Sequence, residues 1–278
     1  MLSIYGDESH DSKKQRAFVV AGLLGDAGQW AALRSPWADR TGGAVFHAAD
    51  CESGYGDFRG IAKQDLTRLH IDLTRSLANS GVIGWGLGID LAGCRRAFPD
   101  MLPTHVYCSG VLRTLDFLLA KAHSTKPLEP VEIVFDRHRE TEHDSGLLFK
   151  YAREGGGWED QGILPAGIRF AARTEIGIQA ADLWARELMK FLDGSVFSKD
   201  YVPRPQWTTL IGTRRFGGDL QFAEYFEDMK LKMPALEAQT GMSRAGYLAW
   251  LQRKRRQDNQ SNRITYMMEV AADDRIPK

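Results

Sequence analysis

The chain has 278 residues, of which 43% are hydrophobic and 26% charged, which is enough apolar material for a sizeable core and argues against a disordered chain. Its 36 Lys and Arg balance its 36 Asp and Glu, so a purely electrostatic nucleic-acid binder is disfavoured, although a local basic face is permitted. Three cysteines without a Cys-x-x-Cys pair argue against a disulfide scaffold and a structural zinc site.

The N-terminus lacks the basic and apolar segments of a signal peptide. No run approaches the roughly eighteen apolar residues that a membrane span requires. We therefore expect a protein of the reducing cytoplasm without a membrane partner.

The first third of the chain predicts a β-hairpin followed by helices. A short apolar strand at 2–6 is joined by a polar connection to a second strand at 17–24. A helix is expected at 26–34, with Asp26 as a possible N-cap and Pro36 ending it, and another at 63–79.

The rest of the chain alternates strands and helices. Strands are expected at 82–91, 131–136 and 168–172, and helices at 106–123, 145–153 and 176–192. A hairpin followed by such alternation is typical of an α/β layer fold with a mixed sheet. We predict this domain over residues 1–195 and a helical extension over 196–278.

Three aspartates lie where α/β folds build their sites. Asp7 and Asp136 each follow a predicted strand, at the end where open sheets place ligands. Asp182 lies in an apolar helical stretch, where a buried carboxylate is costly unless it is paired or binds a cation. Gathered carboxylates repel one another and a hard divalent cation relieves that repulsion, so these three are candidate ligands of Mg²⁺ or Mn²⁺.

Simpler roles remain open for these residues. Asp136 could cap the following turn, and Asp182 could form an ion pair with Arg186, four residues further on. Glu8 joins the site only if the strand ends or bulges there, because strand alternation would otherwise turn it to the opposite face. Gln179 shares the helix face of Asp182.

Other polar residues could contact a substrate. His47 and Asp50 precede a glycine-rich loop, and a histidine near phosphate chemistry can act as acid, base or orienting group; a helix cap with a surface histidine is the alternative. Arg137 and His138 follow the fourth predicted strand and could meet phosphates or belong to a solvated loop. Nothing marks Cys51 as an activated thiol.

Four segments match a known family in order and spacing: 4–9 (Ile-Tyr-Gly-Asp-Glu-Ser), 46–50 (Phe-His-Ala-Ala-Asp), 134–136 (Val-Phe-Asp) and 178–183 (Ile-Gln-Ala-Ala-Asp-Leu). Over about residues 1–195 the chain resembles the large bacterial and phage family known as domain of unknown function 3800, regarded as ribonuclease H-like. The resemblance implies a ribonuclease H-like sheet with four candidate acidic catalytic residues, Asp7, Glu8, Asp136 and Asp182. The usual acidic residue and glycine after the serine are here His10-Asp11, a departure that touches the hairpin rather than the metal site.

Together these features predict a metal-dependent nuclease that hydrolyses phosphodiester bonds of RNA or DNA. The expected metal ligands are Asp7, Asp136 and Asp182, with Glu8 assisting. The candidate substrate contacts are His47, Asp50, Gln179, Arg137 and His138. A non-catalytic nucleic-acid or protein-binding module on the same fold is one alternative. A recombinase- or transposase-like strand-transferase is another, against which the lack of a recognisable separate DNA-binding domain argues.

Overall fold

A six-stranded mixed sheet forms the centre of the computed structural model, which describes residues 1–101, 103–126, 129–137 and 165–240. Its strands are β1 (Leu2–His10), β2 (Ala17–Asp26), β3 (Ile83–Asp90), β4 (Val131–Asp136), β5 (Pro165–Ala171) and β6 (Phe216–Gln221), in the order β5-β4-β1-β2-β3-β6. The first three strands form an antiparallel meander, to which β4 and β5 add in parallel on one side and β6 on the other. The predicted α/β layer fold, a mixed sheet flanked by helices, is confirmed.

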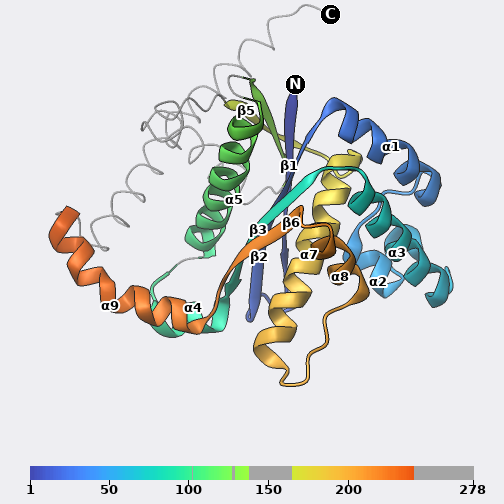
Figure 1. The fold of residues 1–278 in the computed structure, drawn as a ribbon. Helices are drawn as coiled ribbons and strands as arrows, with labels where there is room; N and C mark the ends of the chain where they lie inside the picture. The colour runs from blue at the N-terminus through green and yellow to red at the C-terminus, as the bar shows by residue number, and fades with distance from the viewer. Residues whose placement is uncertain (102, 127–128, 138–164, 241–278) are drawn as a thin grey trace, which may run out of the picture. The chain divides into compact units, whose positions relative to one another are not determined.

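Helices cover both faces of this sheet (Figure 1). One face carries α1 (Ala27–Thr41), α2 (Ala48–Ser53), the 3₁₀ turn η1 (Gly56–Phe58), α3 (Lys63–Asn79), α7 (Ile176–Phe197) and α8 (Pro205–Gly212). The other face carries α5 (Pro103–Thr125), while α4 (Leu91–Ala97) follows β3 and α9 (Ala223–Thr240) follows β6. None of the helices in these described ranges combines the length and hydrophobicity that crossing a membrane requires.

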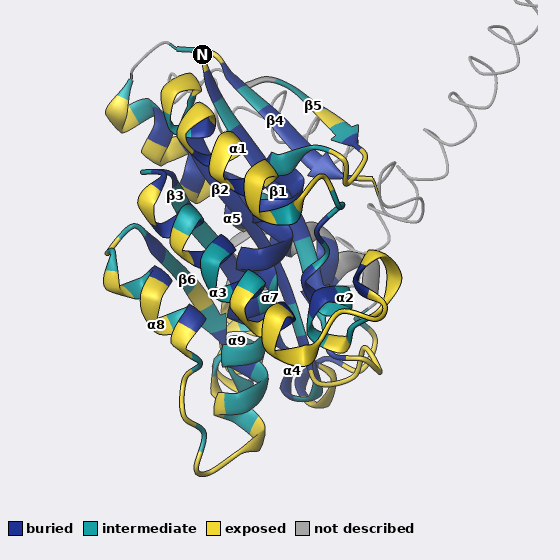
Figure 2. Cartoon of the chain, turned by 90° about the vertical axis from the view of Figure 1, so that its right-hand side faces the viewer, coloured by how far each residue is buried: buried dark blue, intermediate teal, exposed yellow. Residues whose placement is uncertain are grey.

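The α7 helix is the central helix of its layer. Between residues 177 and 189 it is buried at every position except Arg186. Figure 2 shows much of α7 and of the central strands in dark blue behind the exposed outer faces of α1 and α3. A helix buried on nearly all sides holds its side chains in fixed positions, and α7 carries Asp182 and Gln179.

The sheet extends past the predicted domain boundary at residue 195. The chain forms two compact units, Met1–Phe226 and Glu227–Lys278, and β6 belongs to the first. The described part of the second unit lies within α9. The sequence predicts a helical chain from residue 217 onward, but the structure has the strand β6 there. This strand forms because side chains of β6 fit over glycines of β3. A Cβ on Gly84 would lie 2.3 Å from the Phe216 ring, and one on Gly88 2.7 Å from Leu220.

Two predicted ends differ from the structure for local reasons. The Asp11 carboxylate accepts backbone N–H groups of Lys13, Gln15, Arg16 and Ala17, which closes the hairpin loop and lets β1 run to His10 instead of residue 6. The α1 helix begins at Asp26 as predicted but continues through Pro36, because the next residue, Trp37, is fully buried in the core. The predicted helix at 145–153 lies outside the described residues.

Close packing of α7 on β1 depends on Gly177. A Cβ at this position would lie 2.4 Å from the Tyr5 ring. We expect Gly177→Ala to lower the free energy of unfolding by about 1–3 kcal/mol, as overpacking does in other cores. Urea denaturation measures this, with Gly212→Ala as the matched control, since a Cβ there meets no described atom within 4 Å. Equal stability of the two variants would contradict this account of the α7 packing.

Candidate active site

Asp7 and Asp136 lie side by side on two adjacent parallel strands. Gly6 pairs with Phe135, and the next residue of each strand is the aspartate. The residues two positions earlier in each strand, Tyr5 and Val134, pack in the core cluster that includes α7, so alternation places both carboxylates on that face. Asp7 is 2% and Asp136 5% exposed. Asp7 lies inside β1 rather than after its end, because the strand continues to His10.

Asp182 enters the same face of the sheet from α7, which packs directly on β1. Its Oδ2 accepts the backbone N–H of Ala48 at 2.6 Å, and its Oδ1 lies 3.9 Å from His47 Nε2. Ala48 is the first residue of α2, so the Asp182 carboxylate caps that helix. The three predicted carboxylates therefore lie on the α7 side of the sheet, although among the described residues they do not form a set of three ligand atoms that all lie within 4.8 Å of one another.

The carboxylates act on one another electrostatically. Burial raises the pKa of Asp7 well above 3.8, and the charges of Asp182, Glu8 and Asp136 raise it further. Burial also raises the pKa of Asp182, although His47 and the Ala48 N–H oppose that rise. The pKa rise of Asp7 thus includes repulsion from its neighbouring acids, whereas the pKa rise of Asp182 is caused by burial.

Asp7 has an oxygen that no described group satisfies. Its Oδ1 accepts the N–H of Glu8 at 2.7 Å. Its Oδ2 is buried, and no described residue donates a hydrogen bond to it. A buried carboxylate oxygen without a donor costs free energy, so a cation is the natural partner for this atom.

Both oxygens of Asp136 have protein partners. Oδ1 accepts the N–H of Arg137 at 2.9 Å, and Oδ2 accepts Arg173 Nε at 2.8 Å. The hydrogen bond from the Arg137 N–H agrees with the simpler interpretation of Asp136 as a turn cap. The contact with Arg173 brings a guanidinium to Asp136 that the sequence did not predict. Arg173 lies between β5 and α7, and its carbonyl oxygen accepts Gln179 Nε2 at 2.9 Å. The only sequence signal for it is its place just before the helix of Gln179 and Asp182.

Gln179 is buried, and both ends of its amide are engaged with protein groups. Its Nε2 donates to the carbonyl oxygen of Arg173. Its Oε1 accepts hydrogen bonds from Trp37 Nε1 at 2.8 Å and from the N–H of Phe46 at 3.2 Å. It thus ties α1, the segment before α2 and the segment before α7 together. In this structure Gln179 positions the site rather than presenting a free amide to a substrate.

Glu8 faces away from Asp7. The pairing of β1 with β2 continues through Glu8 without a bulge, so alternation turns its side chain to the α5 side of the sheet. It nevertheless lies near the other acids: burial and then the charge of Asp136 raise the pKa of Glu8 to about 7. Glu8 belongs to the electrostatic environment of the site from the opposite face.

His47 and Asp50 form a pair at the edge of the site. His47 Nδ1 lies 2.9 Å from Asp50 Oδ2, and both side chains are partly exposed. His47 occupies the N-cap position of α2, but its side chain makes no capping hydrogen bond, because Asp182 does so instead. Cys51 is fully buried and burial raises its pKa to about 11, so it is not an activated thiol.

Of the two remaining predicted substrate contacts, Arg137 lies in the described part of the chain, directly after Asp136. Arg137 is exposed, and its guanidinium donates to the carbonyl oxygen of Phe170 at 3.2 Å. His138 lies outside the described residues.

The alternative pairing of Asp182 with Arg186 is wrong. Arg186 instead binds Glu52 through Nε at 3.0 Å and through its terminal nitrogen at 2.7 Å. Glu52 also pairs with Arg204, and although burial opposes it, the two guanidiniums lower the pKa of Glu52 to about 2. Arg186 thus belongs to a second charged cluster, which the sequence did not predict.

This second cluster consists of Glu52, His70, Glu187, Arg186 and Arg204. Ligand atoms of the first three lie within 4.8 Å of one another, a spacing that could hold a metal ion. Glu187 Oε1 lies 3.2 Å from His70 Nε2 and 3.1 Å from the Arg204 guanidinium, which are ion-pair distances, but among the described residues neither Glu187 oxygen nor His70 Nε2 has a hydrogen-bond partner. Because two arginines balance the two glutamates, we interpret the cluster as a buried ion-pair network between α2, α3, α7 and the segment before α8.

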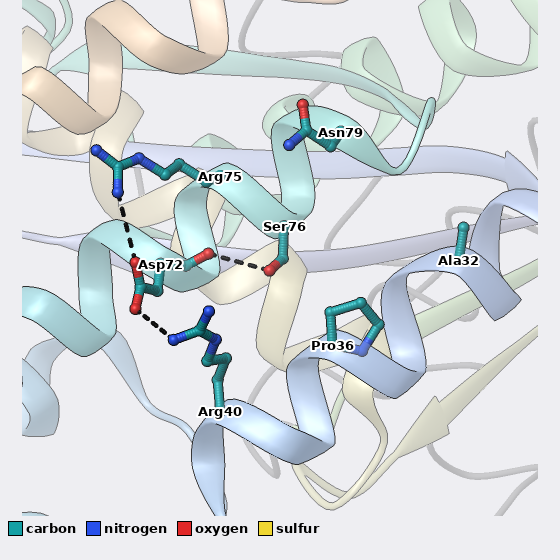
Figure 3. A pocket seen from close by; sticks show the side chains of 7 residues that line it. All are labelled: Ala32, Pro36, Arg40, Asp72, Arg75, Ser76 and Asn79. Carbon is teal, nitrogen blue, oxygen red and sulfur yellow. Dashed lines mark hydrogen bonds and ion pairs between the residues drawn. The ribbon is translucent and has the colours of Figure 1, made fainter.

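A surface pocket between α1 and α3 lies apart from both clusters (Figure 3). Its lining residues are Ala32, Pro36, Arg40, Asp72, Arg75, Ser76 and Asn79. Asp72 lies 2.8 Å from Arg40 and 3.5 Å from Arg75, and both arginines are exposed. Such surface pairs contribute little, and none of the acidic-site residues lines this pocket.

No family model and no curated protein matches the sequence. Among solved structures, the chain is similar to Bst-RNase HIII in complex with Mn²⁺, with 17% identity, a TM-score of 0.42, and coverage of 70% of this chain and 55% of that one. A mutant of the same protein matches with 17% identity, the same coverage and a TM-score of 0.40. The chain thus spans about half the length of these structures.

Proposed function

We propose that this protein is a divalent-metal-dependent nuclease that hydrolyses phosphodiester bonds of RNA or DNA. The observation that carries the proposal is the buried Oδ2 of Asp7, which lacks a donor among the described residues and lies on the face that Asp136 and Asp182 share. An all-carboxylate oxygen set suits Mg²⁺ or Mn²⁺, which leave further coordination positions to water and phosphate oxygens. Asp7 and Asp182 are the principal ligands in this proposal, with Asp136 beside them.

A bound divalent cation supplies a more acidic water and charge neutralisation on the phosphate. The chain's own groups contribute positioning. Arg173 is half-exposed beside Asp136, where its guanidinium can donate to a phosphate oxygen. His47 Nε2 lies 3.9 Å from Asp182 Oδ1, with Asp50 beside the other ring nitrogen, so the imidazole lies where it can accept or release a proton near a phosphate bound at the acids.

We also propose that the chain belongs to the domain of unknown function 3800 family, which its sequence resembles. This proposal is supported by the location of the family's two specific motifs, since residue 7 of the first and residue 182 of the second lie on the same face of the sheet. A cytoplasmic location also remains a prediction.

Incubating the protein with labelled single-stranded RNA, single-stranded DNA, duplexes and an RNA–DNA hybrid tests the function. We expect cleavage of at least one substrate with Mn²⁺ or Mg²⁺, and none with a chelator. Absence of cleavage together with absence of calorimetric Mn²⁺ binding would overturn the proposal and favour a non-catalytic binding module. Joined rather than hydrolysed ends on a supercoiled plasmid would instead favour a strand-transferase.

A further inference from the structure

Arg173 supplies a positive charge to the group of four acids, Asp7, Glu8, Asp136 and Asp182. Its Nε donates to Asp136 Oδ2 at 2.8 Å. Although partial burial works against it, the contact with Asp136 and the charges of Asp7 and Asp182 raise the pKa of Arg173. The guanidinium is therefore a permanent cation that acts on the whole group.

The three aspartates differ in how many carboxylate oxygens lack a described hydrogen-bond donor and could bind a metal. Asp136 has a protein donor on each oxygen, from Arg137 and Arg173. Asp182 uses Oδ2 for the N–H of Ala48, which leaves Oδ1. Asp7 keeps its buried Oδ2 without a described donor. Among these aspartates, the carboxylate oxygens without a described hydrogen-bond donor are thus on Asp7 and Asp182, whereas Arg173 and the Arg137 N–H bind the oxygens of Asp136.

The position of Arg173 is held by the helix that supplies the metal ligand. Gln179 of α7 binds the Arg173 carbonyl, and Asp182 follows three residues later on the same helix. The Arg173 side chain is 45% exposed, and no described residue contacts its terminal nitrogens within hydrogen-bonding distance. The guanidinium can therefore hold Asp136 through Nε and present its terminal nitrogens to a phosphate.

We propose that Arg173 takes the place of a second metal ion, so that the protein binds one divalent cation between Asp7 and Asp182 while the guanidinium neutralises Asp136 and contacts the phosphate. This inference rests on the proposed function and specifies its metal stoichiometry. In two-metal sites the second ion stabilises negative charge on the phosphate, and a guanidinium held in a fixed position can stabilise the same charge.

Titration calorimetry with MnCl₂ and no nucleic acid tests the inference. We expect the wild type to bind one Mn²⁺ per chain. Arg173→Ala is expected to bind a second Mn²⁺ through the freed Asp136, and to bind the first on the order of tenfold more tightly because a nearby positive charge is gone. Arg173→Lys, which keeps the charge, should still bind one. Two ions in the wild type, or unchanged stoichiometry and affinity in Arg173→Ala, would overturn the inference.

Arg169→Ala is the matched control. Arg169 is 44% exposed and pairs with Glu132 and Glu175 instead of the acidic site, so its loss should leave Mn²⁺ binding unchanged. If Arg173→Ala fails to fold, Arg173→Gln removes the charge while keeping a side chain that can donate to Asp136. No Mn²⁺ binding by the wild type would overturn this inference, and it would sink the proposed function as well only if cleavage is also absent, which distinguishes the two failures.

Discussion

Asp7→Asn is expected to abolish cleavage and to stabilise the metal-free protein. The amide keeps an oxygen that can accept the Glu8 N–H, but it removes the anionic ligand, so we expect activity to fall by roughly a hundredfold or more. The same change relieves the cost of a buried charge among other acids, and we expect the free energy of unfolding to rise by on the order of 1 kcal/mol.

The stability gain has a defined pH dependence. Because the folded-state pKa of Asp7 lies above its ordinary value of 3.8, the folded protein loses stability as the pH rises from that value through the raised pKa. The asparagine does not titrate, so the difference between variant and wild type should grow with pH across this window. Urea denaturation in the presence of a chelator, at several pH values, measures it.

Asp219→Asn is a suitable control, because Asp219 is half-exposed and pairs only with the exposed Arg113 among described residues. It should change neither activity nor stability by a comparable amount. Retained cleavage in Asp7→Asn would remove Asp7 from the site. Lost cleavage with a large loss of stability would mean that Asp7 serves the fold rather than the chemistry.

Glu187→Leu is expected to be the most destabilising single change among the charged residues described. Glu187 is 0% exposed, and its carboxylate contacts His70 and Arg204. Removing one member of a buried ion-pair network leaves its partners without compensation, and we expect a loss of about 3 kcal/mol. Denaturant titration measures the loss, and Glu224→Leu, at an exposed glutamate, should change stability by less than about 1 kcal/mol.

The same variant separates an ion-pair network from a metal centre. Mn²⁺ should still raise the melting temperature of Glu187→Leu, because the metal site proposed at Asp7 and Asp182 would be intact. Loss of that Mn²⁺ effect, with little change in stability without metal, would identify the Glu52–His70–Glu187 cluster as the metal centre instead.

The fold could be predicted where local pattern and tertiary packing agree. The hairpin, the strand at β4 and the helix at α7 were evident because their apolar residues recur at strand or helix spacing. The strand β6 was not, because Phe216 and two glycines form a strand only when β3 presents glycines beside them. The continuation of α1 through Pro36 likewise depends on the burial of Trp37, which local propensity does not contain.

The placement of the three aspartates on one side of the sheet could be predicted from the sequence, but their partners could not. Asp7, Asp136 and Asp182 were identifiable from their positions after strands and within an apolar helix. The pairing of Arg186 with Glu52, and of Arg173 with Asp136, joins residues 134 and 37 positions apart, and no local spacing predicts it. Strand alternation turns Glu8 away from Asp7 unless the strand bulges, and the uninterrupted β1–β2 register shows that it does not bulge.

A crystal structure with Mn²⁺, located by its anomalous scattering, tests the central claim most directly. We predict one Mn²⁺ peak coordinated by Asp7 Oδ2 and the Asp182 carboxylate, with the Arg173 guanidinium remaining on Asp136. A peak at Glu52, His70 and Glu187 instead, or no peak near Asp7 at saturating Mn²⁺, would contradict the assignment of these aspartates as a metal-dependent active site.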